Sequence, residues 1–209
     1  MRYNTISNDV LMRRRVTASD ILLDDVFDDK EIELIEQFSS GELSDAKVAH
    51  DKFELEKDIR ESKVRFVKRD YENRWVFEKF NRLIGNINEE FYGFDLYGYD
   101  SFQYTVYDGM HQGHYDWHSD LLYGLDLGDT LHNSMTRKLS LVMLLNEPDV
   151  DFTGGELQLN VGRESEAFSV NLKKGSVAIF PSFVLHRVKP VLSGVRKSLV
   201  IWVEGPKFR

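Results

Sequence analysis

The chain contains no cysteine among its 209 residues. This absence excludes disulfides and thiolate metal sites, so any bound metal must use nitrogen and oxygen ligands. Proline is also scarce, with 4 residues, and no repeat, low-complexity tract or Gly/Ser/Pro linker interrupts the chain. We therefore predict a single globular domain over residues 1–209.

Long apolar runs and an excess of basic charge are missing as well. No run approaches the roughly 20 residues of a membrane span, and Arg13-Arg14-Arg15 is not followed by the apolar stretch of a signal peptide. Lys+Arg 27 against Asp+Glu 35 gives a net charge of −8, which disfavours a general binder of phosphate backbones. We expect a soluble cytoplasmic protein with neither a membrane nor a nucleic acid as partner. The sequence does not indicate an oligomeric state.

The first half of the chain carries helical patterns. Asp28 with Glu31 three positions later is typical of a helix N-terminus, and a helical apolar stripe then runs to Gly41, formed by Ile32, Ile35 and Phe38. A second helix is predicted over residues 73–88, with one face formed by Val76, Phe80, Leu83 and Ile87. We assign residues 1–20 to an N-terminal extension and residues 21–95 to a mainly helical support.

From about Ser101 the apolar period becomes two, which is typical of strands. The predicted strands are Phe102–Tyr107, Lys138–Leu145, Glu156–Asn160, Ser169–Leu172, Ser176–Phe180, His186–Val188 and Ser198–Val203. Many short strands at close spacing indicate a sandwich, a barrel or a double-sheet jelly roll. The fold class is therefore mainly β with N-terminal helices (α+β), and the helices are expected to pack on one face of a sheet formed within residues 96–209.

Two histidines and a carboxylate form the strongest candidate site. His118 and Asp120 stand at i and i+2, so on a strand both side chains leave the same face. A narrow barrel could bring the distant His186 across to the same metal. Two imidazoles and one carboxylate on one face of a metal leave open positions, as in non-haem Fe(II) oxygenases. Each residue alone is more often structural, whereas all three on predicted strands indicate a metal centre.

An arginine follows the second histidine at an interval of ten positions. Arg196, Ser198 and Trp202 share one strand face by the same period of two. The planar guanidinium of Arg196 matches a carboxylate, and the Ser198 hydroxyl can add a hydrogen bond to the same group. Trp202 would lie further along, nearer the metal or the substrate.

The other histidines are weaker candidates. His114 and His118 have the i, i+4 spacing of a helical zinc site, but Gly109 and Gly113 disfavour a helix there and no glutamate lies between them. We expect His111 and His114 to lie in a loop beside the site, where His114 and the neighbouring Trp117 could contact substrate. His50 and His132 are interpreted as structural or surface residues.

Several motifs in this order resemble a known superfamily. They are Tyr107-Asp-Gly, Tyr115-Asp-Trp-His118-Ser-Asp120, Gly154-Gly-Glu-Leu157, Phe180-Pro-Ser-Phe-Val-Leu-His186-Arg-Val and Gly194-Val-Arg196-Lys-Ser198. From Phe102 to Pro206 they are similar to the 2-oxoglutarate- and Fe(II)-dependent dioxygenases, most of all to the prolyl 4-hydroxylase-like branch. In the helical half only Asp58-Ile-Arg-Glu-Ser is recognisable.

The resemblance implies a double-stranded β-helix, a distorted jelly roll buttressed by helices. It implies that His118, Asp120 and His186 bind the iron and that Arg196, helped by Ser198, binds the distal carboxylate of 2-oxoglutarate. A tyrosine of the preceding strand often contacts 2-oxoglutarate in this superfamily. Tyr107 fits that role through its Asp-Gly neighbours, and Tyr104 is the alternative. Many prolyl hydroxylases carry lysine as the anchor, so arginine is a variant within the superfamily.

The expected function is hydroxylation with Fe(II), 2-oxoglutarate and O₂, giving succinate and CO₂, with ascorbate as a reductant in vitro. A prolyl residue in a peptide or protein is the branch's usual substrate, and a free amino acid or other small molecule is the alternative. No recognisable motif marks the two segments that would select the substrate, residues 54–66 and 121–137. Residues 121–137 are interpreted as a lid. A non-catalytic jelly-roll metal-binding module is a further alternative, but such a module has no use for Arg196 with Ser198. Nucleic-acid dealkylation is disfavoured by the acidic balance.

Overall fold

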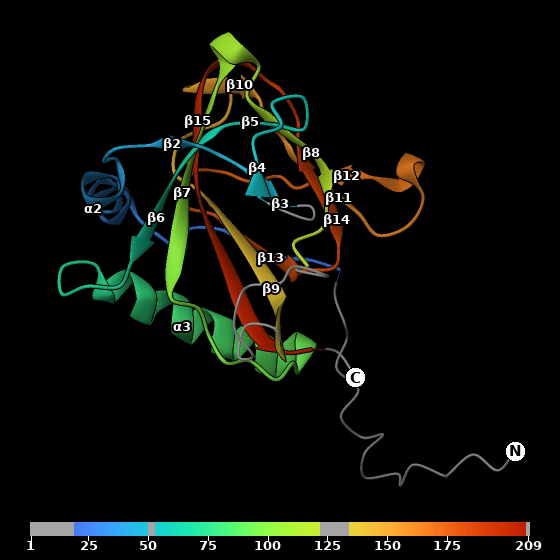
Figure 1. Ribbon diagram of the computed structural model, residues 1–209. Helices are drawn as coiled ribbons and strands as arrows, with labels where there is room; N and C mark the ends of the chain where they lie inside the picture. The colour runs from blue at the N-terminus through green and yellow to red at the C-terminus, as the bar shows by residue number, and fades with distance from the viewer. Residues whose placement is uncertain (1–18, 50–52, 122–133, 208–209) are drawn as a thin grey trace, which may run out of the picture.

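The computed structural model describes residues 19–49, 53–121 and 134–207 (Figure 1). Most of the predicted extension 1–20 and most of the predicted lid 121–137 lie outside these residues, as do His50 and His132. Among the described residues, no helix is long and apolar enough to cross a bilayer.

Helix α2 spans Asp29–Ser39 and begins where the sequence predicted. The Asp28 carboxylate accepts a hydrogen bond from the Glu31 backbone N–H at 2.9 Å, and the Asp28 backbone N–H donates to the Glu31 carboxylate at 3.0 Å. This reciprocal pair satisfies two N–H groups at the helix N-terminus that lack a partner within the helix. The capping prediction is confirmed.

Helix α3 spans Arg74–Ile87, within one residue of the prediction at each end. Its buried residues are Val76, Phe77, Phe80, Ile84 and Ile87. Leu83, which was expected on this face, is only partly buried, and the prediction omitted Phe77 and Ile84. The buried face is thus rotated from the predicted one, because the partner sheet selects the face. A π-helical turn, Asn88–Tyr92, follows and ends at the left-handed Gly93.

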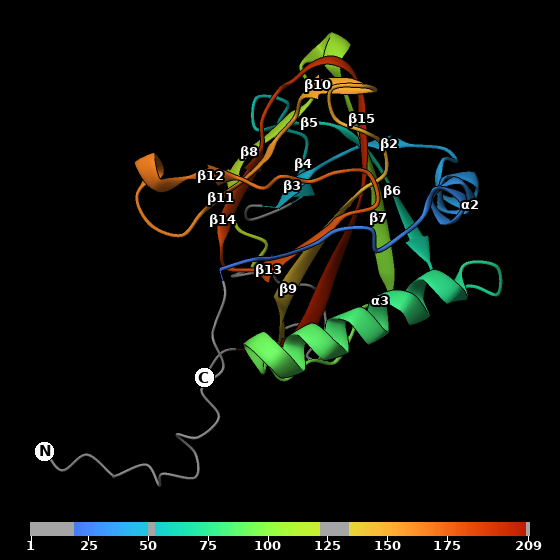
Figure 2. The same cartoon turned by 180° about the vertical axis from the view of Figure 1, so that it is seen from behind.

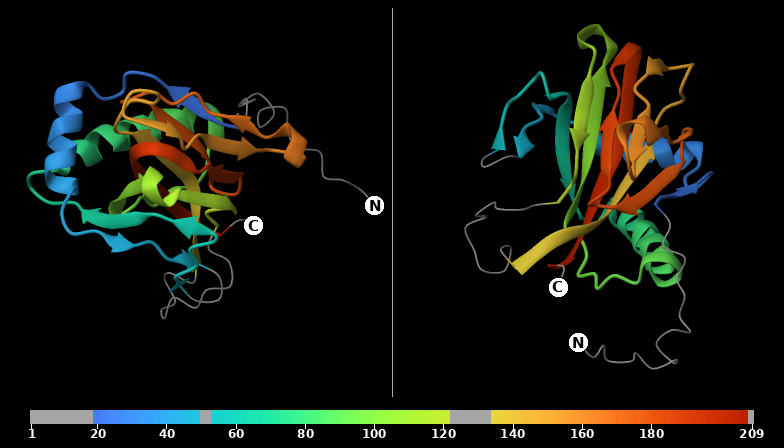
Figure 3. Two further views of the ribbon diagram at one scale, coloured as in Figure 1. Left: turned by 90° about the horizontal axis from the view of Figure 1, so that it is seen from above. Right: turned by 90° about the vertical axis from the view of Figure 1, so that its right-hand side faces the viewer.

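The main sheet is antiparallel and has eight strands. Their order is β1 (Ile21–Leu23), β13 (Val177–Pro181), β9 (Met135–Leu144), β15 (Val191–Pro206), β7 (Ser101–Asp108), β6 (Lys63–Lys68) and β2 (Ser44–Asp45), and β10 (Phe152–Gly154) pairs with one end of β15. The long strands β7, β9 and β15 run side by side (Figure 3). Strands β9 and β15 cover the predicted strands except Leu145, and β15 begins well before the predicted Ser198.

The smaller sheet has five short strands. Their order is β12 (Phe168–Ser169), β11 (Leu157–Asn160), β14 (Leu185–Val188), β8 (His114–His118) and β5 (Arg60–Glu61). A separate hairpin joins β3 (Val48–Ala49) to β4 (Phe53–Glu54). Residues 21–68 therefore contribute six short strands that the sequence analysis did not assign. The predicted strand Ser169–Leu172 was placed too late, since β12 ends at Ser169.

Alternation along the central strands divides the apolar core into two layers. One face of the main sheet, including Leu141 and Ile201, packs on α3 residues such as Phe80. The other face, including Leu144 and Phe180, packs on the smaller sheet. Helix α3 crosses the back of the main sheet, as Figure 2 shows. The mainly β, helix-buttressed jelly roll is confirmed, and the space between its two sheets holds the candidate site.

Candidate metal centre

His118, Asp120 and His186 converge as predicted. Their candidate ligand atoms all lie within 4.8 Å of one another. Asp120 Oδ1 is 3.8 Å from His118 Nε2, and Asp120 Oδ2 is 3.3 Å from His186 Nε2. The two histidines do not meet across a barrel, however: β8 and β14 are neighbours in the smaller sheet, and His118 stands directly opposite His186. Asp120 follows the end of β8.

A β-bulge shapes this site. The pairing His118–His186 is followed by Tyr115–Val188, so β8 contains one more residue than β14 between the two pairs. A bulge of this kind re-aims side chains. Tyr115 and His118, which strict alternation would place on opposite faces, therefore stack with their ring centroids 3.5 Å apart. The sequence analysis missed Tyr115 because it assumed a regular strand.

Hydrogen bonds orient both imidazoles. His118 Nδ1 lies 2.7 Å from the Asp116 carbonyl oxygen, and His186 Nδ1 lies 2.9 Å from the Val184 carbonyl oxygen. A carbonyl oxygen only accepts, so each Nδ1 must carry the proton. Each Nε2 is then the nitrogen that faces Asp120 and can bind a metal.

The surroundings favour the metal-binding forms of His118 and Asp120. Burial lowers the pKa of His118 to about 3, which keeps its imidazole neutral. Burial raises the pKa of Asp120, but His186, His118 and Arg137 outweigh this and hold it well below its usual range. Burial lowers the pKa of His186, but nearby Asp120 outweighs this and raises it. A proton and a metal ion would therefore compete for Nε2 of His186.

Arg196 is a buried cation, with only 1% of its surface exposed. Its Nη1 donates to Ser198 Oγ at 3.0 Å, and its guanidinium carbon lies 5.5 Å from the centroid of the Tyr107 ring. Within the described residues no carboxylate pairs with it. A buried charge without a counter-ion is costly. The side chain is therefore suited to receive an anion.

The two candidate tyrosines lie on opposite faces of β7. Tyr107 belongs to the core between the two sheets, on the side of Arg196. Tyr104 belongs to the core beneath the helices, where burial raises its pKa to about 12. Tyr104 therefore cannot contact a ligand between the sheets, and Tyr107 remains the candidate.

Gly155 makes room for Arg196. Its φ is +68°, a conformation that favours glycine, and a Cβ added there would lie 2.9 Å from both Arg196 Cδ and Val191 Cγ2. We expect Gly155→Ala to displace the guanidinium and to weaken 2-oxoglutarate binding without affecting metal affinity. Anaerobic titrations of metal and of 2-oxoglutarate check this separately. Gly85→Ala, at an exposed helical site with no atom within 4 Å of the added Cβ, is the matched control.

A cavity of ≈ 420 Å³ opens beside Asp120. Trp202 lines it, as predicted, and so do Tyr115 and two arginines that the sequence analysis did not select. The Arg137 guanidinium carbon lies 3.9 Å from the centroid of the Trp202 ring, and that of Arg60 lies 4.4 Å from the Tyr115 ring. No pattern of spacing marks these arginines, since the two sheets bring them together from distant strands.

Trp117 and His114 do not line this cavity. Trp117 stacks under the Arg187 guanidinium at 4.5 Å, and Arg187 in turn donates to Gln158. Both ring nitrogens of His114 lie against backbone carbonyl oxygens, those of Gln112 and Asp58. The expectation that Trp117 and His114 contact the substrate therefore gains no support from this cavity and stays a prediction. His114 begins β8 instead of lying in a loop, and His111 ends an exposed 3₁₀ turn.

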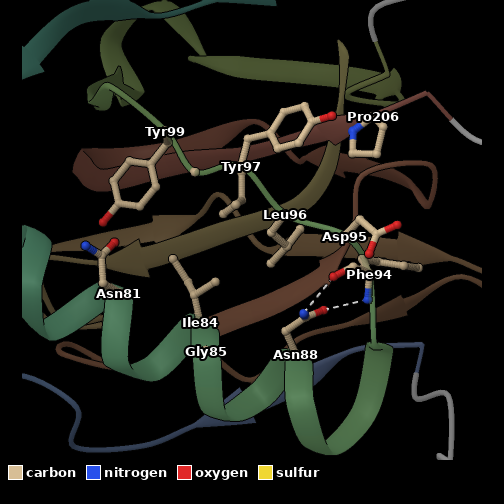
Figure 4. Close-up of a pocket in the computed structure, with 12 residues that line it drawn as sticks. Asn81, Ile84, Gly85, Asn88, Phe94, Asp95, Leu96, Tyr97, Tyr99 and Pro206 are labelled. Atoms are coloured by element: carbon tan, nitrogen blue, oxygen red, sulfur yellow. Dashed lines mark hydrogen bonds between the residues drawn. The ribbon is translucent and has the colours of Figure 1, made fainter. Parts of the chain in front are cut away.

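A larger cavity, ≈ 840 Å³, lies away from the metal ligands. It is bounded by α3, by residues 94–99 and by the end of β15 (Figure 4). The Asn88 side chain closes one end through hydrogen bonds with the Phe94 backbone N–H and carbonyl groups. None of the predicted site residues lines it, so size does not identify the functional cavity here.

Comparison with known proteins agrees with this geometry. Residues 102–204 match the model of the 2OG-Fe(II) oxygenase superfamily. Over these residues the chain is similar to this superfamily. A PKHD-type hydroxylase of Synechococcus sp. (strain JA-2-3B'a(2-13)) is 32% identical over 93 residues, which are 43% of this chain and 40% of the relative. One of Colwellia psychrerythraea is 39% identical over 86 residues, 40% of this chain and 37% of the relative. The match thus spans about two fifths of these relatives.

Solved structures share the fold. A prolyl hydroxylase from Trichoplax adhaerens, in complex with a peptide fragment of hypoxia inducible factor, superposes with a TM-score of 0.68 at 18% identity, covering 88% of this chain and 83% of that one. A Pseudomonas putida prolyl-4-hydroxylase superposes with a TM-score of 0.64 at 20% identity, covering 88% and 91%. At this identity the likeness concerns the fold alone.

Proposed function

We propose that this protein is a 2-oxoglutarate- and O₂-dependent hydroxylase that uses Fe(II) and gives succinate and CO₂. The observation that carries the proposal is the pairing of a His-Asp-His cluster, in which Asp120 and His186 are buried, with a buried arginine that lacks a counter-ion among the described residues. The donor set fits Fe(II), since two imidazoles and one carboxylate without thiolate are the ligands of such oxygenases. A metal held only for stability has no need of the arginine.

The protein's own groups would position the reactants. Bound Fe(II) would supply O₂ activation, while His118, Asp120 and His186 hold it through Nε2 atoms and a carboxylate. Arg196 and Ser198 would receive the distal carboxylate of 2-oxoglutarate, beside the Tyr107 ring. The apolar side chains between the sheets, among them Leu144 and Phe180, would keep water from the reacting atoms.

For the substrate we propose a prolyl residue in a peptide or protein. The PKHD-type relatives and the prolyl hydroxylase neighbours support this choice. The cavity beside Asp120 has an opening lined by Trp202, whose ring offers an apolar surface for a pyrrolidine. A second candidate is a free amino acid. It is favoured by Arg60 and Arg137, which line the same cavity and form no ion pair within the described residues, so that either could bind an α-carboxylate.

We expect succinate to form from 2-oxoglutarate under air with Fe(II), with ascorbate as reductant, and to form faster with the true substrate. The panel comprises proline-containing peptides, free proline and other amino acids, with product mass as a second readout. Stimulation by peptides but not by free proline would support the prolyl-peptide assignment, and the reverse would support the small-molecule candidate. A protein that binds neither Fe(II) nor 2-oxoglutarate anaerobically would contradict the proposed function itself.

A further inference from the structure

Two buried serines contact the carboxylate ligand. Ser140, in the central strand β9, donates its hydroxyl proton to Asp120 Oδ2 at 2.6 Å. The Ser182 hydroxyl oxygen, in the turn between β13 and β14, lies 2.9 Å from that of Ser140. Both serines are fully buried. The sequence analysis assigned a role to neither serine, although Ser182 lies in the motif that contains His186.

The direction of these hydrogen bonds follows from proton count. A serine hydroxyl has one proton to donate and two lone pairs that accept. The ionised Asp120 carboxylate can only accept hydrogen bonds, so the Ser140 hydroxyl must donate its proton to it. Ser182 must therefore donate to Ser140. The length of 2.6 Å is that of a charge-assisted O–H···O⁻ bond, and a donor behind Ser140 strengthens it further.

The same turn also holds the Asp120 backbone. The Asp120 N–H donates to the Ser182 carbonyl oxygen at 2.9 Å, and the Ser182 N–H donates to the Lys138 carbonyl oxygen at 3.0 Å. Asp120 itself lies beyond the end of β8, outside any strand ladder. Hydrogen bonds from β9, made directly by Ser140 and through Ser182, therefore fix the position of Asp120. Strand β9 lies between β13 and β15 in the main sheet. The two sheets are coupled at the metal ligand.

We propose that Ser140 is a positioning residue for the metal centre and that Ser182 acts through it. The Ser182–Ser140–Asp120 chain orients the carboxylate before metal arrives and occupies Oδ2, which leaves Oδ1 without a hydrogen bond within the described residues. This inference rests on the proposed function, because it assumes that Asp120 binds a metal. Hydrogen-bond partners that orient metal ligands in this way typically contribute about 10–100-fold in metal affinity.

The test is anaerobic titration of the intact protein with Fe(II) alone, and with Co(II) as a spectroscopic probe. We expect Ser140→Ala to weaken metal binding by about 10–100-fold and to alter the Co(II) spectrum. Ser182→Ala should weaken it less, because Ser140 still donates to Asp120. The double variant should bind no more weakly than Ser140→Ala, because Ser182 acts only through Ser140.

Ser39→Ala is the matched control. Ser39 is as buried as Ser140, but it ends helix α2 and its hydroxyl has no hydrogen-bond partner in the described part of the chain. It should leave metal affinity unchanged. Wild-type affinity in Ser140→Ala would overturn the inference, and additive losses in the double variant would overturn the order of the chain. Should Ser140→Ala not fold, unchanged affinity in Ser182→Ala would overturn the inference. A wild-type protein that binds no metal would contradict the proposed function instead.

Discussion

Replacing Asp120 with alanine should abolish hydroxylation. Asp120 is the single carboxylate of the ligand cluster and lies within 3.8 Å of both imidazoles, so its loss leaves two neutral nitrogens to hold a dication. Since loss of a mere hydrogen-bond partner of a ligand costs about 10–100-fold, loss of the ligand itself should cost at least roughly a hundredfold in Fe(II) affinity. Succinate formation in the presence of substrate should fall to background.

The variant also removes the negative charge that compensates nearby cations. Asp120 opposes His186 and the partly buried Arg137, so its removal leaves less negative charge beside them. Thermal unfolding of the metal-free variant must therefore be measured beside activity, and Asp120→Asn, which preserves volume, separates loss of charge from loss of packing. Full activity in a folded Asp120→Ala protein would contradict the ligand assignment. Asp116→Ala, at an exposed position of the preceding strand β8, is the matched control.

Replacing Arg196 with methionine should abolish tight 2-oxoglutarate binding while sparing the fold. A hydrogen bond to a charged group contributes about 1.5–3 kcal/mol, so loss of the anchor should weaken 2-oxoglutarate binding by roughly 10–150-fold. The metal ligands are untouched, so Fe(II) affinity should not change. Because Arg196 is buried without a carboxylate among the described residues, an apolar side chain should not lower the stability of the ligand-free protein and could raise it.

These expected changes in affinity and stability distinguish an arginine that anchors a ligand from one that only stabilises the fold. In the wild type, saturating 2-oxoglutarate should raise the melting temperature through preferential binding to the folded state, and in Arg196→Met this rise should vanish. Arg196→Lys retains the charge but not the planar fork, and should restore part of the affinity. A melting temperature that falls sharply in Arg196→Met, with an unchanged response to 2-oxoglutarate, would indicate that Arg196 stabilises the fold and binds no dicarboxylate.

The sequence by itself determined the identity of the candidate ligands and much of the framework. Helix α2 could be predicted because capping depends on two residues three positions apart. Strands β7, β9, β13 and β15 could be predicted because alternation and β-branched composition are local properties of the sequence. His118, Asp120, His186 and Arg196 were found because their residue types suit one chemistry, whatever the exact pairing of their strands. These are properties of short segments, so no tertiary structure was required to recognise them.

Only the tertiary structure decided which side chains share the site. Tyr104 and Tyr107 are three apart, so alternation places them on opposite faces. Only the packing of one face against α3 shows which face lies between the two sheets. The bulge in β8 turned Tyr115 toward His118, and Trp117 packs with Arg187, because strand pairing there shifts by one residue. Ser140 and Arg137 reach the site from β9, and Arg60 reaches it from β5 in the other sheet. Such contacts depend on register and on the approach of two sheets, which are non-local, and no window of sequence contains both partners.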